Sequence, residues 1–173
     1  MSYDLIPALD FHLKNNIPIA KVVIADLLQH EKVVYLKGIT GQRCEMTPAL
    51  FVPDRMYKVD SLLLDQFVQS GASPTIKRLN AVKKTKPFPY WYLGRIDDVI
   101  IPKYFAMKTA EQKCMIGGVN LSVIMYNESR TEADIVVDFQ EYAHGELKLF
   151  YSVHLTKKTG VWEIVQKVFL ING

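Results

Sequence analysis

The chain has 173 residues, of which 49% are hydrophobic and 23% are charged, and its net charge is +3. These values predict one globular domain over residues 1–173 and exclude a disordered chain. The small positive charge does not by itself indicate a nucleic-acid partner. No apolar run approaches the roughly 20 residues that span a bilayer, and no basic stretch precedes an apolar one near the first residue. We therefore expect a cytoplasmic protein with no secretory signal and no membrane partner.

Two helices are predicted at the start of the chain. Leucines recur every four residues over 4–14, and Pro18 suits the first turn of a second helix over 18–30. The asparagine pair at 15–16 predicts a break between these helices.

The next segment predicts a strand, a turn, a returning strand and a third helix. Residues 32–37 are rich in β-branched and aromatic side chains, a glycine-bearing turn follows, and 43–52 is the expected partner strand. A helix is then expected from 54 to about 70. Gly71 should end that helix, because glycine adopts the left-handed conformation that often follows a helix.

Residues 72–113 are predicted to be an irregular excursion from the regular elements. Their hydrophobic periodicity is weak, and four prolines interrupt them, at positions 74, 87, 89 and 102. So long a stretch predicts short local elements rather than a simple loop.

The strongest pattern is a period-two alternation of apolar and polar residues near the C-terminus. Alternation between glycine-bearing turns predicts an antiparallel β-meander with one buried face and one solvated face. Trp162 is expected to lie on the buried face. The glycine pair at 117–118 is read as a turn before the first strand. Strands are predicted over 119–126, 133–142, 146–156 and from 161 onward, with turns at 127–130, 144–145 and 158–160.

Together these elements predict an α+β fold, with N-terminal helices packed on a curved, mainly antiparallel sheet. The order of elements and the terminal run Gly160-Val161-Trp162-Glu163-Ile164 resemble the cone-shaped NTF2-like (SnoaL-like) superfamily. The resemblance implies a bent sheet that wraps around helices and leaves a pocket. That superfamily includes dehydratases, isomerases, transport factors and toxin-immunity proteins, so the resemblance implies no single function.

The cysteines, histidines and glycines indicate no metal or cofactor site. Cys44 and Cys114 lie far apart in sequence, and we expect two reduced thiols. The four histidines show neither HxH nor HxxxH spacing, so we expect no bound metal. The glycine pairs are too isolated to form phosphate-binding loops, and we expect no cofactor.

The most unusual composition lies at 77–95, where basic and aromatic residues are interleaved without an acidic residue. Cations neutralise phosphates and aromatic rings stack on bases, which suits single-stranded nucleic acid. The same residues suit an acidic protein, because aromatic and arginine side chains anchor protein interfaces. A third reading is a loop whose aromatic rings pack inward. The candidate binding residues are Lys83, Lys84, Lys86, Tyr90, Trp91, Tyr92 and Arg95.

An acid–base site is the alternative to a binding surface. Asp134, Asp138 and His154 fall on the polar side of the predicted meander, and a carboxylate beside an imidazole is the minimum for proton transfer. If the chain is an enzyme, Asp138 or His154 should face a closed cavity. If it is a binding protein, we expect both side chains to be largely exposed.

Three functions follow from these patterns. The first is a non-enzymatic protein-binding module, such as a toxin-neutralising immunity protein or an assembly component. The second is a small-molecule enzyme of the dehydratase or isomerase type, with a pocket inside the curved sheet. The third is a single-stranded nucleic-acid binder acting through 77–95. The absence of a catalytic motif favours the protein-binding module, and a homodimer stays open.

Overall fold

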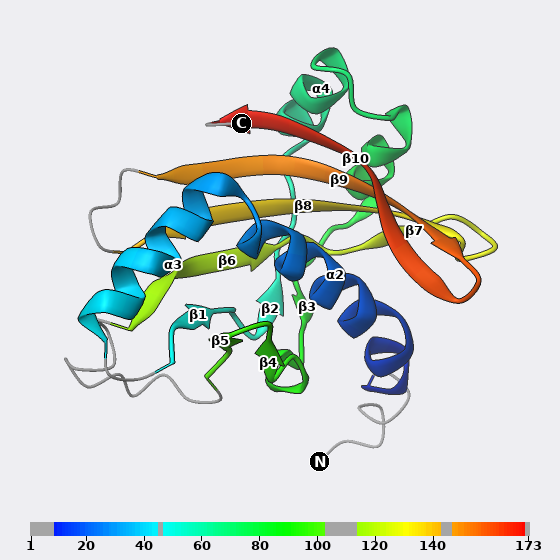
Figure 1. Cartoon of the computed structure of the whole chain (residues 1–173). Coiled ribbons are helices and arrows are strands. Elements are labelled where there is room, and N and C mark those ends of the chain that lie inside the picture. The colour runs from blue at the N-terminus through cyan, green and yellow to red at the C-terminus, as the bar shows by residue number, and fades with distance from the viewer. Residues whose placement is uncertain (1–8, 45–46, 103–113, 143–146, 172–173) are drawn as a thin grey trace.

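The computed structural model describes residues 9–44, 47–102, 114–142 and 147–171. The chain forms a curved mixed sheet with helices packed against it (Figure 1). The predicted α+β class, with helices on a curved and mainly antiparallel sheet, is confirmed.

The main sheet has the strand order β10-β9-β8-β6-β1-β5-β4, and the short strand β7 also pairs with β8. Strand β1 runs parallel to both of its neighbours, whereas the other neighbouring strands are antiparallel. A separate pair joins β2 (Arg55–Met56) to β3 (Lys86–Pro87). The strands of the main sheet are β1 (Ala49–Phe51), β4 (Arg95–Ile96), β5 (Val99–Ile100), β6 (Met115–Leu121), β7 (Met125–Tyr126), β8 (Glu132–Glu141), β9 (Lys148–Lys158) and β10 (Val161–Ile171).

The predicted C-terminal meander is confirmed by β8, β9 and β10, which pair antiparallel in sequence order. Their alternation places one set of apolar residues in the main core, and Trp162 is buried there. Thr159 and Gly160 both have positive φ, which matches the twist of a tight hairpin turn between β9 and β10. The predicted turn at 144–145 lies outside the described residues.

The glycine pair at 117–118 does not form a turn but lies within β6. A Cβ atom on Gly117 would overlap the carbonyl oxygen of Gln140 on the neighbouring strand. Glycine therefore allows close strand packing here, which is the other common role of glycine in a sheet. The strand predicted over 119–126 is divided between β6 and β7.

The first two predicted helices are joined rather than separated. Residues 9–11 are helical, a π-helical turn η1 (His12–Asn16) follows, and α2 (Ile17–Leu28) continues directly from it. The predicted break at 15–16 is therefore wrong. Asn16 is buried and bonds within the fold, since its Oδ1 accepts a hydrogen bond of 2.5 Å from the Tyr126 hydroxyl. Residues 4–8 of the predicted helix lie outside the described residues.

The strand predicted over 32–37 is instead part of helix α3 (Glu31–Arg43). The His30 side chain caps this helix by accepting a hydrogen bond from the Lys32 amide, and Val33 is buried. Local β preference is weak and is overridden by such contacts. The expected partner strand at 43–52 shrinks to β1, which pairs with β5 and β6.

The face of the meander expected to meet solvent is partly covered by α4 (Ser61–Gln69) and the 3₁₀ helix η2 (Pro74–Ala81). Asp60 caps α4, so this helix begins later than the predicted residue 54. Gly71 follows it with a φ of 106°, as predicted. A second apolar cluster joins both helices to Val136 on β8. Period-two alternation finds a strand but does not reveal what packs on its second face.

The excursion from residue 72 contains only short elements as far as it is described. These are η2, β3, the 3₁₀ turn η3 (Tyr90–Tyr92), β4 and β5. Residues 103–113 of the excursion lie outside the described residues. Among the described residues, no helix combines the length and apolar character needed to cross a membrane.

The expectation of two reduced thiols is wrong, because Cys44 and Cys114 form a disulfide. Their Cα atoms are 5.6 Å apart, which is an ordinary separation for a bridged pair. Cys44 follows the last residue of α3, and Cys114 directly precedes β6. The bridge therefore ties the end of α3 to the start of an interior strand of the main sheet.

Candidate functional site

The basic and aromatic segment divides into residues that face the core and residues that face solvent. Phe88, Tyr90 and Leu93 belong to the main apolar core. In η3, the Leu93 amide donates to the carbonyl of Tyr90, which closes a 3₁₀ turn. Residues three apart in a 3₁₀ turn share one face. Tyr90 and Leu93 therefore point inward together, and the two residues between them are turned outward.

Those two outward residues are Trp91 and Tyr92, whose exposed fractions are 46% and 42%. Their ring centroids are 6.0 Å apart, and the Tyr90 ring meets Trp91 edge-on at 5.5 Å. The buried Tyr90 ring thus packs against Trp91 and helps to hold the exposed pair in place. The alternative in which all the aromatic rings pack inward is wrong for Trp91 and Tyr92.

Four cations of the predicted set flank these rings in the sequence. Lys83, Lys84 and Lys86 are exposed, and among the described residues they form no ion pair. Arg95 is also exposed, and its Nε donates to the Asp97 carbonyl at 3.2 Å. We call Lys83, Lys84, Lys86, Trp91, Tyr92 and Arg95 the η3 surface.

The acidic side chains of the turn after β4 form hydrogen bonds with residues in α3 and at the C-terminal end of α2 rather than with the lysines of this surface. Asp98 pairs with Lys37 of α3 at 3.0 Å, and this hydrogen bond lowers the pKa of Asp98. Asp97 accepts a hydrogen bond of 3.3 Å from Gln29. Both carboxylates therefore bond to side chains of the helical region, although the Arg95 charge also helps to lower the pKa of Asp98. Lys83, Lys84 and Lys86 keep the η3 surface basic.

Comparison with protein-family models, curated proteins and solved structures found no match. A functional conclusion therefore depends on the chemistry of the residues themselves. Among the described residues, no group of three histidine, cysteine, aspartate or glutamate side chains is placed to hold a metal ion.

The candidate acid–base residues form a different network from the one expected. His154 Nδ1 lies 2.7 Å from Asp134 Oδ1, and its Nε2 lies 3.4 Å from Glu132 Oε1. The Thr75 hydroxyl of η2 donates to the other Asp134 oxygen at 2.7 Å. The side chains of His154 and Asp134 are only 14% and 7% exposed. The expectation of a largely exposed His154 is therefore wrong, because η2 packs over this part of the sheet.

Asp138 does not join this network. It lies opposite Phe150 in the β8–β9 register, whereas His154 lies opposite Asp134. Asp138 is half-buried, and burial raises its pKa. His154 therefore pairs with Asp134 and not with Asp138, the carboxylate expected beside it in an enzyme.

The network lacks the arrangement that activates a nucleophile. Both nitrogens of His154 face carboxylates, and the Thr75 hydroxyl donates to Asp134 rather than to the imidazole. Nucleophilic catalysis needs a hydroxyl or thiol within reach of the base. The network instead ties η2 to β8 and β9. Thr75 and Glu132 are members of this network that the sequence did not predict. Glu132 lies two residues before Asp134 on the same strand face, which is the one sequence signal of its role.

The His154 network predicts a pH-dependent contribution to stability. Burial lowers the pKa of His154, but its hydrogen bonds to the Asp134 and Glu132 carboxylates outweigh burial and raise that pKa overall. Because the folded-state pKa is raised, the stabilisation from protonated His154 is complete at pH values below the unfolded-state pKa. It is lost as the pH rises through the folded-state pKa. We expect the free energy of unfolding of the wild type to exceed that of His154→Gln most at acid pH. Urea unfolding of both proteins between about pH 5.5 and 8.5 measures this difference, since the unfolded histidine titrates near 6.5. A difference that grows with rising pH would contradict the assignment.

Proposed function

We propose that the chain is a non-enzymatic protein-binding module that recognises an acidic partner through the η3 surface. The observation that carries this proposal is the exposed Trp91–Tyr92 pair, held outward by a turn whose other residues are in the core. A toxin-neutralising immunity protein and an assembly component both fit this function. The partner is expected to present carboxylates around an apolar recess.

The side chains that gain most from leaving water are expected to anchor the partner. Tryptophan, tyrosine and arginine dominate the residues whose truncation weakens protein interfaces. Rings that are already fixed lose little conformational freedom on binding. The Tyr90 ring beneath Trp91 supplies such fixation. The lysines remain hydrated and mainly accelerate encounter with an acidic partner.

Single-stranded nucleic acid is the second candidate, because exposed rings beside cations also suit it. The burial of Phe88 and Tyr90 supports the protein partner instead, since it leaves only Trp91 and Tyr92 of this segment's rings for stacking on bases. We expect no appreciable affinity for a generic single-stranded oligonucleotide at physiological salt. A tight complex that weakens steeply with salt would reverse this ranking.

An enzyme with its pocket inside the curved sheet is not favoured. The face of the sheet against which α2 packs is filled by large buried side chains, among them Phe139, Tyr151 and Trp162. A relation to the NTF2-like superfamily remains a proposal, supported by helices packed on a curved sheet. A cytoplasmic location is likewise a proposal, and the Cys44–Cys114 disulfide weighs against it because cytosolic thiols are usually reduced.

The proposal is tested by affinity capture from cells that produce the protein, with three variants as bait. Trp91→Ala should weaken recovery of the partner about tenfold or more, the usual scale for an aromatic anchor. Lys83→Ala combined with Lys84→Ala should weaken it less, because exposed charges contribute mainly to the association rate. Tyr35→Ala is the matched control, since Tyr35 is an exposed aromatic on α3, outside the η3 surface.

The competing outcomes are distinct. Equal recovery with the wild type and Trp91→Ala contradicts the proposed surface. Loss with the double lysine variant alone, together with nuclease sensitivity, supports nucleic acid in place of a protein partner.

A further inference from the structure

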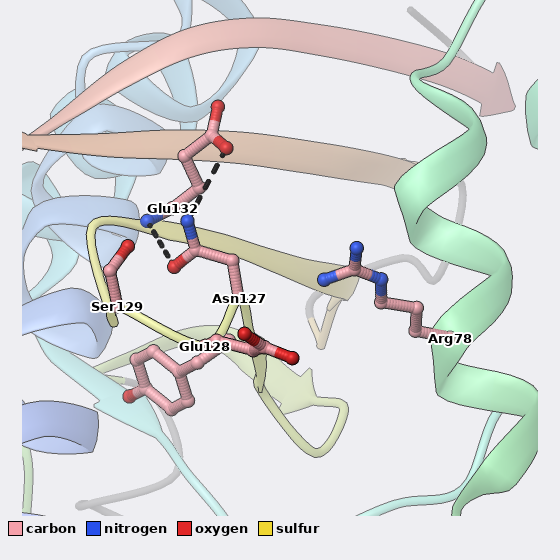
Figure 2. A pocket seen from close by; sticks show the side chains of 6 residues that line it. Arg78, Asn127, Glu128, Ser129 and Glu132 are labelled. Carbon is pink, nitrogen blue, oxygen red and sulfur yellow. Dashed lines mark hydrogen bonds between the residues drawn. The ribbon is translucent and has the colours of Figure 1, made fainter.

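An open pocket of about 650 Å³ lies between η2 and the turn that joins β7 to β8. Figure 2 shows Arg78 reaching from η2 toward the opposite wall, which the turn provides. This pocket is on the face of the sheet that η2 covers, and it does not overlap the η3 surface. Its lining residues are Arg78, Tyr126, Asn127, Glu128, Ser129 and Glu132.

The two walls of the pocket carry opposite charges that do not meet. Arg78 supplies a guanidinium on one side and Glu128 supplies a carboxylate on the other. The Glu132 carboxylate already contacts His154 Nε2 at 3.4 Å and Asn127 Nδ2 at 3.5 Å. Among the described residues, neither Arg78 nor Glu128 forms an ion pair or a side-chain hydrogen bond. A molecule that carries both charges would therefore find complementary groups at its two ends.

The acidic wall is held in place by a side chain at the base of the turn. Asn127 Oδ1 accepts hydrogen bonds from the amides of Thr131 and Glu132 at 2.9 and 3.0 Å. Its Nδ2 donates to the Thr131 hydroxyl at 3.1 Å. Asparagine side chains that bond nearby backbone in this way stabilise turns. Glu128 is thus carried on an ordered turn.

The basic wall is held by the His154 network. Thr75 and Arg78 are three residues apart in the 3₁₀ helix η2, so they share one face. Asp134 and Glu132 are two residues apart on β8, so they also share one face. The hydrogen bond from Thr75 to the buried Asp134 therefore sets the position of Arg78 relative to Glu132. The hydrogen bonds thus fix the backbone on both walls, while the Arg78 and Glu128 side chains stay free to meet a ligand.

We propose that this pocket binds a small zwitterion, of the amino-acid or short-peptide class. Its carboxylate pairs with the Arg78 guanidinium, whose planar fork can donate two parallel hydrogen bonds. Its ammonium group pairs with the Glu128 carboxylate on the opposite wall. Because the pocket is open to water, binding is weak, with a Kd on the order of 1 mM.

The test is an NMR titration of the isotopically labelled protein with glycine, glycylglycine and 4-aminobutyrate. These probes place the two charges at different separations. Acetate and methylammonium are the controls, since each carries one of the two charges. We expect at least one zwitterion to shift the amide signals of 127–132 and the Arg78 Nε–H signal in a saturable manner. Both single-charge controls should bind at least about tenfold more weakly.

Two variants assign the binding to the two walls. Arg78→Gln and Glu128→Gln should each weaken zwitterion binding about tenfold, because each removes one charge-assisted contact. Both residues are exposed, so the variants should fold normally, which far-UV circular dichroism checks. Lys77→Gln is the matched control, since Lys77 lies on η2 and pairs with Asp65 away from the pocket. The proposal is overturned if no zwitterion gives saturable shifts, if acetate or methylammonium binds equally well, or if both wall variants retain wild-type affinity.

Discussion

Replacing Trp162 by alanine should lower the free energy of unfolding by about 3–5 kcal/mol. Trp162 is buried in the main core, where its ring lies 6.0 Å from that of Tyr126 and beneath the Lys157 ammonium at 5.8 Å. The change removes a large apolar surface and leaves a cavity where β10 meets the rest of the sheet. Urea unfolding followed by circular dichroism measures the effect.

Trp162→Phe is the control for the aromatic ring itself. Among the described residues, the buried indole Nε1 has no hydrogen-bond partner, so phenylalanine breaks no hydrogen bond there. The phenylalanine variant should lose clearly less stability than the alanine variant, because most of the apolar contact remains. Wild-type stability of Trp162→Ala would contradict the placement of this residue in the core.

Removing the Cys44–Cys114 disulfide should cost about 4 kcal/mol, the value that the chain-entropy model assigns to a closed loop of this length. The two cysteines are 70 residues apart, so the bridge restricts a large part of the unfolded chain. The double variant Cys44→Ser with Cys114→Ser should therefore unfold at lower urea concentration. Wild-type protein treated with dithiothreitol should behave in the same way.

Helix α3 should respond most strongly to loss of this disulfide. Of its 13 residues only Val33 is buried, and glycines occupy positions 38 and 41. Glycine within a helix costs about 1 kcal/mol relative to alanine. Amide hydrogen exchange in α3 should rise more than exchange in β8 and β9 when the bridge is removed. Two reactive thiols in the unreduced protein would show that the bridge is not formed.

The meander was predictable because its side chains alternate without interruption. In β8 and β9, Ile135, Val137, Val153 and Leu155 all face the main core, as their alternation predicts. The opposite face was not predictable, since α4 and η2 reach it through contacts distant in sequence. Val136 shows the difficulty, because it sits on the supposedly solvated face and is fully buried.

The errors elsewhere have the same physical origin. The run at 32–37 favours a strand locally, yet a cap at His30 and packing of Val33 make it helical. Sequence spacing carries no information on whether Cys44 and Cys114 approach each other. Local propensity is worth only a few tenths of a kcal/mol per residue, so tertiary contacts decide such cases.

The candidate surface was predictable in composition but not in orientation. Interleaved aromatic and basic residues marked 77–95, but the sequence did not reveal that Tyr90 turns inward and Trp91 outward. Which of these rings faces the core depends on how the 3₁₀ turn η3 is rotated about its axis. Packing of Phe88 and Leu93 in the core sets that rotation. The link between Thr75 and Asp134 spans 59 residues and leaves no local signal.

The most direct test of the proposed binding surface uses the fluorescence of Trp91 alone. The chain has two tryptophans, so Trp162→Phe leaves Trp91 as the single reporter. In the free protein this exposed residue should emit at the long wavelengths typical of a hydrated indole and be quenched readily by acrylamide. Titration with the captured protein partner should shift the emission to shorter wavelengths and reduce quenching, because the ring leaves water. Saturable partner binding with unchanged Trp91 emission and quenching would contradict the proposed surface.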